Sequence, residues 1–495
     1  MEIDVVEASP AEVAADVLAF AVPEPVELPA AGQELDRLVD GGIRHLIEDG
    51  ELKGERGKVT LLHTRDTLKA HRVAAGGIGP DRDSDSLRTA AAAVACRASE
   101  VGGKTIAWIL SENGLPAHEQ VRAVVDGIAL GPYDAGIWKT KDEQAPIERL
   151  VLCGPGAGEA AEEARRANVI AAWTNRCRDL VNAPPNVCTP TTLAEFAEET
   201  AGRFEHLSFS ALGPDEIREA GMGALTAVSQ GSENPARLIT LSYEPPSPAR
   251  GDVVLGLIGK AITFDSGGLS LKPATRMDEM KTDMGGGGAV LAATGAIAEL
   301  GLPVKVLTVV PSCENMPGGR SYRPGDIITA LNGKTIEVTN TDAEGRLILA
   351  DALTHARRSG ATHMLDLATL TGAIVIAMGD YYAGLYSNDA SWTEEIQAAA
   401  ETTGDHVWPM PLHDTYRRYI ESPYADMKNS SEYRQGSPAL AARFLQEFVG
   451  EGTWAHLDIA GTAYLERTRE DYYGAPGATG YGVRLLAELA RRFSS

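Results

Sequence analysis

The sequence has few of the features that mark membrane, secreted or nucleic-acid-binding proteins. Nowhere do 18 apolar residues run together, so no segment is expected to span a membrane. The first residues, Met-Glu-Ile-Asp, include no basic segment followed by an apolar one, so no signal peptide is expected. Lysine and arginine number 45 against 69 aspartates and glutamates, which gives a formal net charge of −24 and no basic run. That balance disfavours binding to nucleic acid or to an anionic membrane.

Cysteine is also scarce. No two of the five cysteines have a CxxC or other paired spacing, and an odd number cannot all form disulfides. Reduced thiols, and therefore a cytoplasmic protein, are the natural interpretation. The five cysteines are Cys96, Cys153, Cys177, Cys188 and Cys313.

Three common catalytic signatures are missing. The nearest approach to the His-Glu-x-x-His zinc motif, residues 118–122, ends in arginine. No Gly-x-Ser-x-Gly nucleophile motif occurs. Gly259-Lys260 is followed by Ala261 rather than serine or threonine, so a phosphate-binding P-loop is absent.

The most informative stretch is residues 339–347, Thr-Asn-Thr-Asp-Ala-Glu-Gly-Arg-Leu. It places the carboxylates of Asp342 and Glu344 and the guanidinium of Arg346 within five residues. The apolar run 335–338 before it predicts a strand, and the spacing after Leu347 predicts a helix, so these charges are expected on a turn at a strand's C-terminal end. Two acids this close require a bound metal or a tight arginine pairing.

A second group of charges follows an expected strand at residues 253–258. Lys260, Asp265, Lys272 and Asp283 are spread over a glycine-rich loop that opens a helix at about residue 287. Such loops let the backbone approach a ligand or ion closely. The four glycines at 285–288 fit either a tight helix entry or a backbone that touches metal ligands or substrate. Taken singly, an aspartate here would be expected to cap a helix or face solvent; the metal hypothesis depends on their joint occurrence.

These two segments resemble the signature blocks of the leucyl (cytosol) aminopeptidase family, whose members are two-metal exopeptidases. The octapeptide 340–347 is the most specific match, and the resemblance extends from about Arg178 to the C-terminus. Ala261 stands where the family mostly has glycine, and Gly287-Gly288 replaces frequent alanines, so the rigidity of these loops is in question. The supporting matches are Arg-Asp-Leu-Val-Asn at 178–182, Pro-Pro-Asn at 184–186, Arg-Pro-Gly-Asp at 323–326 and His-Leu-Asp-Ile-Ala-Gly at 456–461.

Hydrolysis of an amide needs a nucleophilic water, a polarised carbonyl and a stabilised oxyanion, and two divalent ions about 3.5–4 Å apart supply the first two. The resemblance implies that Asp265 and Glu344 bridge two such ions. Asp342 would complete the looser site, and Lys260 with Asp283 the tighter one. Lys260 would bind only as a neutral amine, and its nitrogen favours manganese, zinc or cobalt over calcium.

The remaining roles also come from the resemblance. Lys272 would stay charged and stabilise the oxyanion. Arg346, which stays protonated in proteins, would hold a bicarbonate ion as proton shuttle. Asp283 and a metal would bind the free α-amino group of a peptide substrate and so confine cleavage to the first residue. An apolar pocket suited to leucine, methionine or bulkier side chains would be formed by Met280, Thr369, Gly372, Ala460 and Ala463.

At 495 residues the chain is too long for one core. We expect an α/β protein with a smaller N-terminal α/β domain at residues 1–155, a connecting helix at 156–182, and a larger catalytic domain at 183–495 with a mixed central sheet flanked by helices. The resemblance implies a homo-hexamer. Expected strands are 2–6, 16–22, 58–63, 104–110, 149–153, 253–258, 304–310, 362–367 and 454–459. Expected helices are 32–49, 86–99, 118–129, 156–181, 287–300, 347–359, 438–449 and 482–493.

Two other functions stay open. The chain could be a noncatalytic scaffold that keeps the fold, which a turnover assay on leucine anilide would decide. It could instead be a phosphate- or nucleotide-binding enzyme that uses the glycine-rich loop. That function predicts thermal stabilisation by nucleotide without any need for a transition metal.

Overall fold

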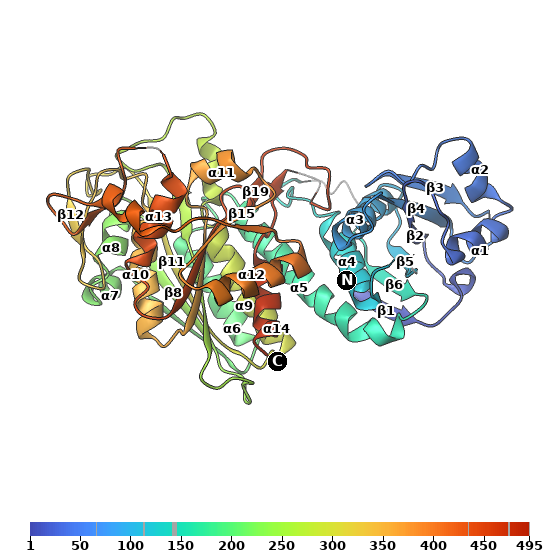
Figure 1. The fold of residues 1–495 in the computed structure, drawn as a ribbon, viewed down its shortest axis with the longest axis horizontal. Coiled ribbons are helices and arrows are strands. Elements are labelled where there is room, and N and C mark those ends of the chain that lie inside the picture. The colour runs from blue at the N-terminus through green and yellow to red at the C-terminus, as the bar shows by residue number, and fades with distance from the viewer. Residues whose placement is uncertain (66, 112–113, 141–145, 434, 474–475, 495) are drawn as a thin grey trace. The chain divides into compact units, whose positions relative to one another are not determined.

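The computed structural model describes residues 1–65, 67–111, 114–140, 146–433, 435–473 and 476–494. The chain forms two compact units, drawn in Figure 1 with the chain coloured from blue to red. One unit is Met1–Asn175 with Arg467–Pro476, and the other is Arg176–Glu466 with Gly477–Ser495. The predicted two-domain α/β class is confirmed. The division falls inside helix α5, Ala161–Asn182, while the predicted boundaries at residues 155 and 182 stay a prediction.

The first unit contains a six-stranded sheet in the order β1-β6-β5-β2-β4-β3, in which only β3 runs antiparallel to its neighbour. Strand β2 is buried throughout because its apolar residues lie in the middle of the sheet. The strands are β1 Glu2–Val6, β2 Val17–Pro23, β3 Val59–His63, β4 Arg72–Gly79, β5 Thr105–Ile109 and β6 Arg149–Cys153. The main helices around it are α1 Ala30–Leu38, α2 Gly42–Glu48, α3 Ser84–Glu100 and α4 Ala117–Leu130.

Two sequence expectations fail in this unit. The single helix predicted at 32–49 is two helices, α1 and α2, because Asp40 and Gly41 take φ values of 54° and 78° and break the helical path. Strand β4 was not predicted, since its alanines and glycines give little hydrophobic alternation. It nevertheless pairs with β2 along seven positions, and so lies within the sheet.

The second unit is built on a nine-stranded mixed sheet in the order β16-β15-β18-β14-β9-β11-β8-β7, with β10 paired to β11. Strands β18, β14, β9 and β11 are parallel, whereas β15, β8 and β7 introduce antiparallel pairs. The mixed sheet predicted here is therefore confirmed. The strands are β7 Leu207–Leu212, β8 Arg237–Tyr243, β9 Val254–Gly259, β10 Ala261–Asp265, β11 Lys305–Asn315, β14 His363–Ala368, β15 Ala383–Ser387, β16 Val407–Pro409 and β18 Thr453–Asp458.

The central strands are buried along nearly their whole length, as expected for parallel strands covered by helices on both faces. Helices α9 and α10 pack on β9 and β11. The helices of this unit are α6 Pro190–Gly202, α7 Pro214–Glu219, α8 Gly223–Ser229, α9 Gly285–Leu300, α10 Gly345–Arg358, α11 Gly372–Met378, α12 Ala390–Thr403, α13 Ser437–Gln446 and α14 Val483–Arg492. None of the described helices has the length and apolar character needed to cross a membrane.

A small three-stranded sheet carries the turn that the sequence singled out. Its strands are β12 Ile327–Thr329, β13 Thr335–Glu337 and β17 Met427–Lys428. The predicted strand before the charged run is β13, and the charged turn does follow it. This strand belongs to the small sheet rather than the large one, so other contacts must bring the turn to the edge of the large sheet.

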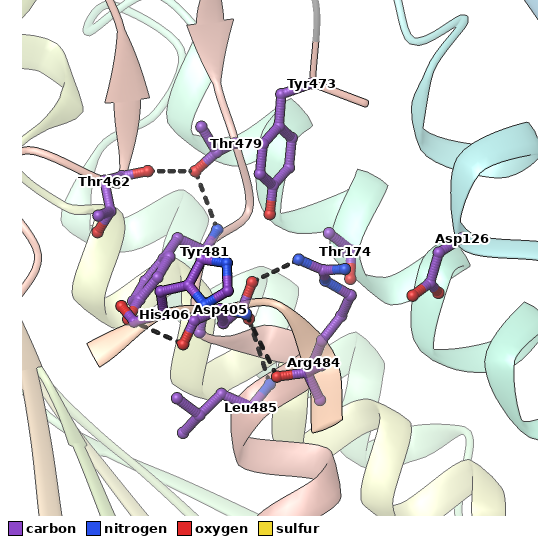
Figure 2. Close-up of polar contacts among 12 residues, drawn as sticks. Asp126, Thr174, Asp405, His406, Thr462, Tyr473, Thr479, Tyr481, Arg484 and Leu485 are labelled. Atoms are coloured by element: carbon purple, nitrogen blue, oxygen red, sulfur yellow. Dashed lines mark hydrogen bonds and ion pairs between the residues drawn. The ribbon is translucent and has the colours of Figure 1, made fainter. Parts of the chain in front are cut away.

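The chain after β18 is fixed by a buried polar cluster (Figure 2). Thr479 Oγ1 donates to the carbonyl of Thr462 at 2.6 Å. The carboxylate of Asp405 accepts from the backbone N–H of Leu485 at 3.2 Å and pairs with Arg484 at 2.6 Å, at the start of α14. The bond from Thr479 fixes Thr462, which lies between Ala460 and Ala463, two residues predicted to form part of a substrate pocket.

Candidate metal centre

Charged residues from both sequence motifs meet at one cavity of about 650 Å³ in the second unit. Lys260 lies between β9 and β10, and Asp265 ends β10. Asp283 follows the 3₁₀ helix Met277–Thr282, and Glu344 caps α10. Every site residue predicted from the sequence lines this cavity, with the exception of Ala463. Ala463 is buried, and its Cβ would lie 3.3 Å from a Cβ added at Gly285.

Three carboxylates converge closely enough to share an ion. Asp265, Asp342 and Glu344 each offer an oxygen, and these oxygens all lie within 4.8 Å of one another. Asp265 and Glu344 are only 3% and 2% exposed. Carboxylates this near to one another and this far from water repel strongly unless cations compensate them.

In the structure two lysines provide that compensation. Lys260 Nζ lies 2.8 Å from Asp283 Oδ2 and 2.9 Å from Glu344 Oε1. Lys272 Nζ lies 2.8 Å from Asp265 Oδ2 and 2.7 Å from Asp342 Oδ1. Four carboxylates against two ammonium groups leave a net charge of −2, so the cluster still favours further positive charge.

The pKa values follow from this crowding. Burial lowers the pKa of Lys260, but the carboxylates of Asp283 and Glu344 act more strongly together and raise it above its ordinary value. The pKa of Lys272 is raised for the same reason, chiefly by Asp265 against the effect of burial. Burial raises the pKa of Asp283, although Lys260 opposes this shift. Among the groups described, both lysines are therefore held as ammonium ions by the carboxylates around them.

The donor set fits divalent metal ions. Glu344 Oε2 is buried and has no hydrogen-bond partner among the residues described, so one ligand oxygen is unused. The carbonyl oxygen of Thr369 lies 3.1 Å from Lys260 Nζ and adds another oxygen beside it. Carboxylates with one nitrogen donor suit manganese or zinc, provided that Lys260 loses its proton.

Two asparagines that the sequence analysis missed fix the predicted ligands. Asn315 ends β11 opposite Asp265, and its Nδ2 donates to Asp265 Oδ1 at 2.9 Å and to the carbonyl of Thr341 at 3.0 Å. It therefore joins the two sequence motifs. The sequence could have indicated this residue, because it lies at the carboxyl end of a strand, where α/β sheets place their functional residues.

Asn429 is fully buried and holds the charged turn from the other side. Its Nδ2 donates to the carbonyl of Asn340 at 2.7 Å, and its Oδ1 accepts from the N–H of Thr339 at 2.9 Å. Its own carbonyl accepts from Arg346 Nη1 at 2.9 Å. These bonds hold the turn against the segment that follows β17 in the small sheet, whereas the bond from Asn315, at the end of β11, joins the turn to the large sheet. No sequence signal marked this residue, which follows a strand of only two residues.

Two glycines allow the close packing of the site. A Cβ on Gly286, in the first turn of α9, would lie 2.0 Å from the carbonyl oxygen of Leu367. A Cβ on Gly345 would lie 2.6 Å from Lys260 Nζ. The glycines at 285–288 form the first turn of α9 and do not line the cavity. The backbone N–H of Gly287 also donates to the carbonyl of Lys260 at 2.7 Å, so the structure is compatible with both interpretations left open by the sequence.

Arg346 is 7% exposed and lines the same cavity. Burial lowers the pKa of its guanidinium to about 10, so it remains a cation at neutral pH. Its Nε is buried without a hydrogen-bond partner among the described residues. This leaves a donor that an anion in the cavity would satisfy.

Comparison with known proteins agrees with this geometry. The sequence matches the model of the cytosol aminopeptidase family's catalytic domain over residues 175–487 and that of its N-terminal domain over residues 17–142. A probable cytosol aminopeptidase of Solibacter usitatus is 43% identical over 91% of this chain and 92% of its own. One from Roseiflexus castenholzii is 41% identical over 99% of each chain.

Solved structures are similar along nearly the whole chain. A mutant of tomato leucine aminopeptidase has a TM-score of 0.90 at 34% identity and covers 99% of this chain and 96% of its own. The bottromycin maturation enzyme BotP in complex with Mn has a TM-score of 0.86 at 35% identity, covering 97% and 100%. With both of its domain models matched in order and the two motifs gathered at one cavity, this chain belongs to the cytosol aminopeptidase family.

Proposed function

We propose that this protein is a metal-dependent aminopeptidase that removes an apolar first residue, with leucine or methionine preferred, from peptides with a free N-terminus. The observation that carries the proposal is the set of four carboxylates bridged by two lysines on the wall of one cavity. Such a cluster has an excess of negative charge that two divalent ions would neutralise. Membership of the cytosol aminopeptidase family supports the reaction class.

Two divalent ions, manganese or zinc, would supply an activated water and a polarised peptide carbonyl when bound. Asp265 and Glu344 would be the bridging ligands, with Asp342 at the looser site and Lys260 and Asp283 at the tighter one. The unused oxygen of Glu344 and the convergence of Asp265, Asp342 and Glu344 support this assignment.

The protein's own groups would bind and orient the substrate. Asp283 and a bound metal would receive the free α-amino group and so fix the first peptide bond at the centre. Lys272 keeps its proton because Asp265 and Asp342 surround it, and its side chain is 22% exposed to the cavity. It would stabilise the oxyanion through Nζ. Arg346 would hold bicarbonate through its free Nε–H, and bicarbonate when bound would supply proton transfer.

The first side chain of the substrate would lie against the wall around Met280, Thr369, Gly372 and Ala460. Alanine at 463 packs beside Gly285 and does not itself line the cavity. Because its side chain is small, we propose that the pocket accepts larger groups than leucine. Water leaves this wall when an apolar side chain covers it, and each buried methylene contributes about 0.8 kcal/mol.

We extend the proposal to the assembly and place of action. The protein would form a homo-hexamer, act in the cytoplasm, and divide into residues 1–155, a connecting helix at 156–182 and a catalytic domain at 183–495. The names of the relatives support the cytoplasm, and light scattering would measure the assembly.

Turnover of leucine anilide by purified protein, together with elemental analysis of its metals, tests the proposed function. We expect hydrolysis that requires manganese or zinc. Absence of turnover with both metal sites filled would favour a noncatalytic scaffold. Thermal stabilisation by nucleotide in metal-free protein would instead favour a nucleotide-binding enzyme.

A further inference from the structure

Asp458 is a buried carboxylate at the end of β18 that touches none of the predicted metal ligands directly. It is 1% exposed. Its Oδ1 accepts from the backbone N–H groups of Leu370 at 3.2 Å, Thr371 at 3.4 Å and Ala460 at 3.3 Å. Its Oδ2 accepts from Thr371 Oγ1 at 2.6 Å. Its partners are thus backbone N–H groups and one hydroxyl, which all belong to segments that line the cavity.

The segment that Asp458 holds carries Thr369 into the metal centre. Strands β14 and β18 are parallel neighbours, and Ala368 at the end of β14 pairs with Asp458. The next residue, Thr369, has its carbonyl 3.1 Å from Lys260 Nζ. Its Oγ1 donates to Asp283 Oδ1 at 2.7 Å. Thr369 thus contacts both Lys260 and Asp283, and the next two residues, Leu370 and Thr371, are the ones whose N–H groups bind Asp458.

Burying a carboxylate is unfavourable unless its oxygens are hydrogen-bonded. Asp458 is kept in place by four bonds, and three of them, from Leu370 and Thr371, restrict the peptide units on both sides of Leu370. Rotation of the Thr369–Leu370 peptide would move the Thr369 carbonyl away from Lys260 and break the bond from Leu370 to Asp458 at once. The carboxylate thus links the orientation of this peptide to the end of a rigid strand.

We propose that Asp458 is a positioning residue for the part of the metal centre that contains Lys260 and Asp283. It orients the turn after β14 so that Thr369 holds these two side chains in the geometry that binds metal. This inference rests on the proposed function, since it concerns the same site. It assigns to Asp458 a geometric role, which depends on acceptor oxygens rather than on negative charge.

The test uses Asp458→Ala and Asp458→Asn in the full-length protein. Asparagine keeps an oxygen for the three N–H groups, and Thr371 Oγ1 can accept from its amide; alanine loses all four bonds. We expect Asp458→Ala to weaken Mn²⁺ affinity by about 10–100-fold, as loss of an outer hydrogen-bond partner usually does. Asp458→Asn should stay within several-fold of the parent, and excess Mn²⁺ should restore most of the turnover of Asp458→Ala.

Asp351 provides a matched control. It is a fully buried carboxylate on α10 that accepts from the N–H groups of Leu225 at 2.9 Å and Leu331 at 2.7 Å. Neither leucine lines the cavity. Asp351→Ala should lower the melting temperature but leave Mn²⁺ affinity and the kcat/KM of the folded fraction unchanged.

Thr371→Val removes only the hydroxyl bond to Asp458 Oδ2, and it keeps the test open if Asp458→Ala does not fold. We expect several-fold weaker Mn²⁺ binding from this variant. Unchanged Mn²⁺ affinity in both Asp458→Ala and Thr371→Val would overturn the inference. Equal losses in the alanine and asparagine variants would overturn the geometric role. Mn²⁺ affinity is measured by calorimetry without substrate, so a parent protein that lacks turnover would refute the proposed function and leave this test intact.

Discussion

The proposed metal centre has two halves, each with the same pattern of charge but with a different exposure to water. Each half places one lysine between two carboxylates. The deep half is Lys260, Asp283 and Glu344, and the outer half is Lys272, Asp265 and Asp342. The side chains of Lys260 and Glu344 are 3% and 2% exposed, whereas those of Lys272 and Asp342 are 22% and 33% exposed.

This difference in exposure predicts different roles: the exposed half can contact substrate, and the buried half depends on its fixed partners. Water near Lys272 and Asp342 screens their charges and allows the lysine to meet an incoming substrate. The side chain of Lys260 is almost inaccessible to water, so Asp283 and Glu344 balance its charge, and loss of one partner from a buried pair costs about 3–5 kcal/mol. We therefore expect the deep half to be the tighter metal site, and the outer half to act on the reacting carbonyl.

Metal removal should have the largest effect, because it affects both halves. Chelation should abolish turnover and lower the melting temperature together, since the four carboxylates then lose their strongest counter-charges. The ion of the outer half should leave first, because water reaches Asp342. Elemental analysis during a chelator titration would show this order. Full activity in protein verified to be metal-free would contradict the two-metal proposal.

Lys260→Arg should abolish metal binding in the deep half alone. Arginine keeps the positive charge but cannot lose its proton to coordinate a metal. We expect the variant to lose the tighter ion and detectable turnover, and Lys272→Arg, its matched control, to retain both ions and part of the activity. Metal content after gel filtration is the measurement. Two ions bound as tightly as in the parent would show that Lys260 is not a ligand.

Blocking the substrate's amino group should test Asp283 of the deep half. A buried polar site rejects an analogue that lacks its partner by up to about 10⁴–10⁵-fold. We expect acetylation of a good peptide's N-terminus to lower kcat/KM by on the order of 10⁴. The same peptide with a C-terminal amide serves as control and should be cleaved normally. Comparable cleavage of acetylated and free peptides would remove the role of Asp283 in amine recognition.

Lys272→Ala should give the smallest of these effects and should be confined to the outer half. Deleting one oxyanion donor usually lowers kcat by about 10²–10³. Metal content should stay unchanged, because Lys272 is not proposed as a ligand. Steady-state kinetics at saturating metal would measure the loss. A drop in bound metal equal to that of Lys260→Arg would mean that the two halves do not differ as we propose.

The sequence alone singled out the two charged segments, because their residue types and order resemble those of a known family, and both segments line one cavity. It also predicted the central strands and the helices α9 and α10, where continuous apolar runs favour burial. The helix at 32–49 failed for a local reason that periodicity ignores, the positive φ at Asp40 and Gly41. Strand β4 was not predicted, because its alanines and glycines give little hydrophobic alternation.

What the sequence by itself determined is the chemistry: which carboxylates, lysines and arginine are available, and the family that combines them. Tertiary structure alone decided which lysine pairs with which carboxylate, since Lys260 and Glu344 are distant in sequence and meet only when α10 packs on β9. It also decided the parts played by Asn315 and Asn429, whose bonds to the motifs span 50 and 89 residues. Hydrogen bonds of that range depend on the register of strands and the packing of helices, and no local pattern of residue types encodes them.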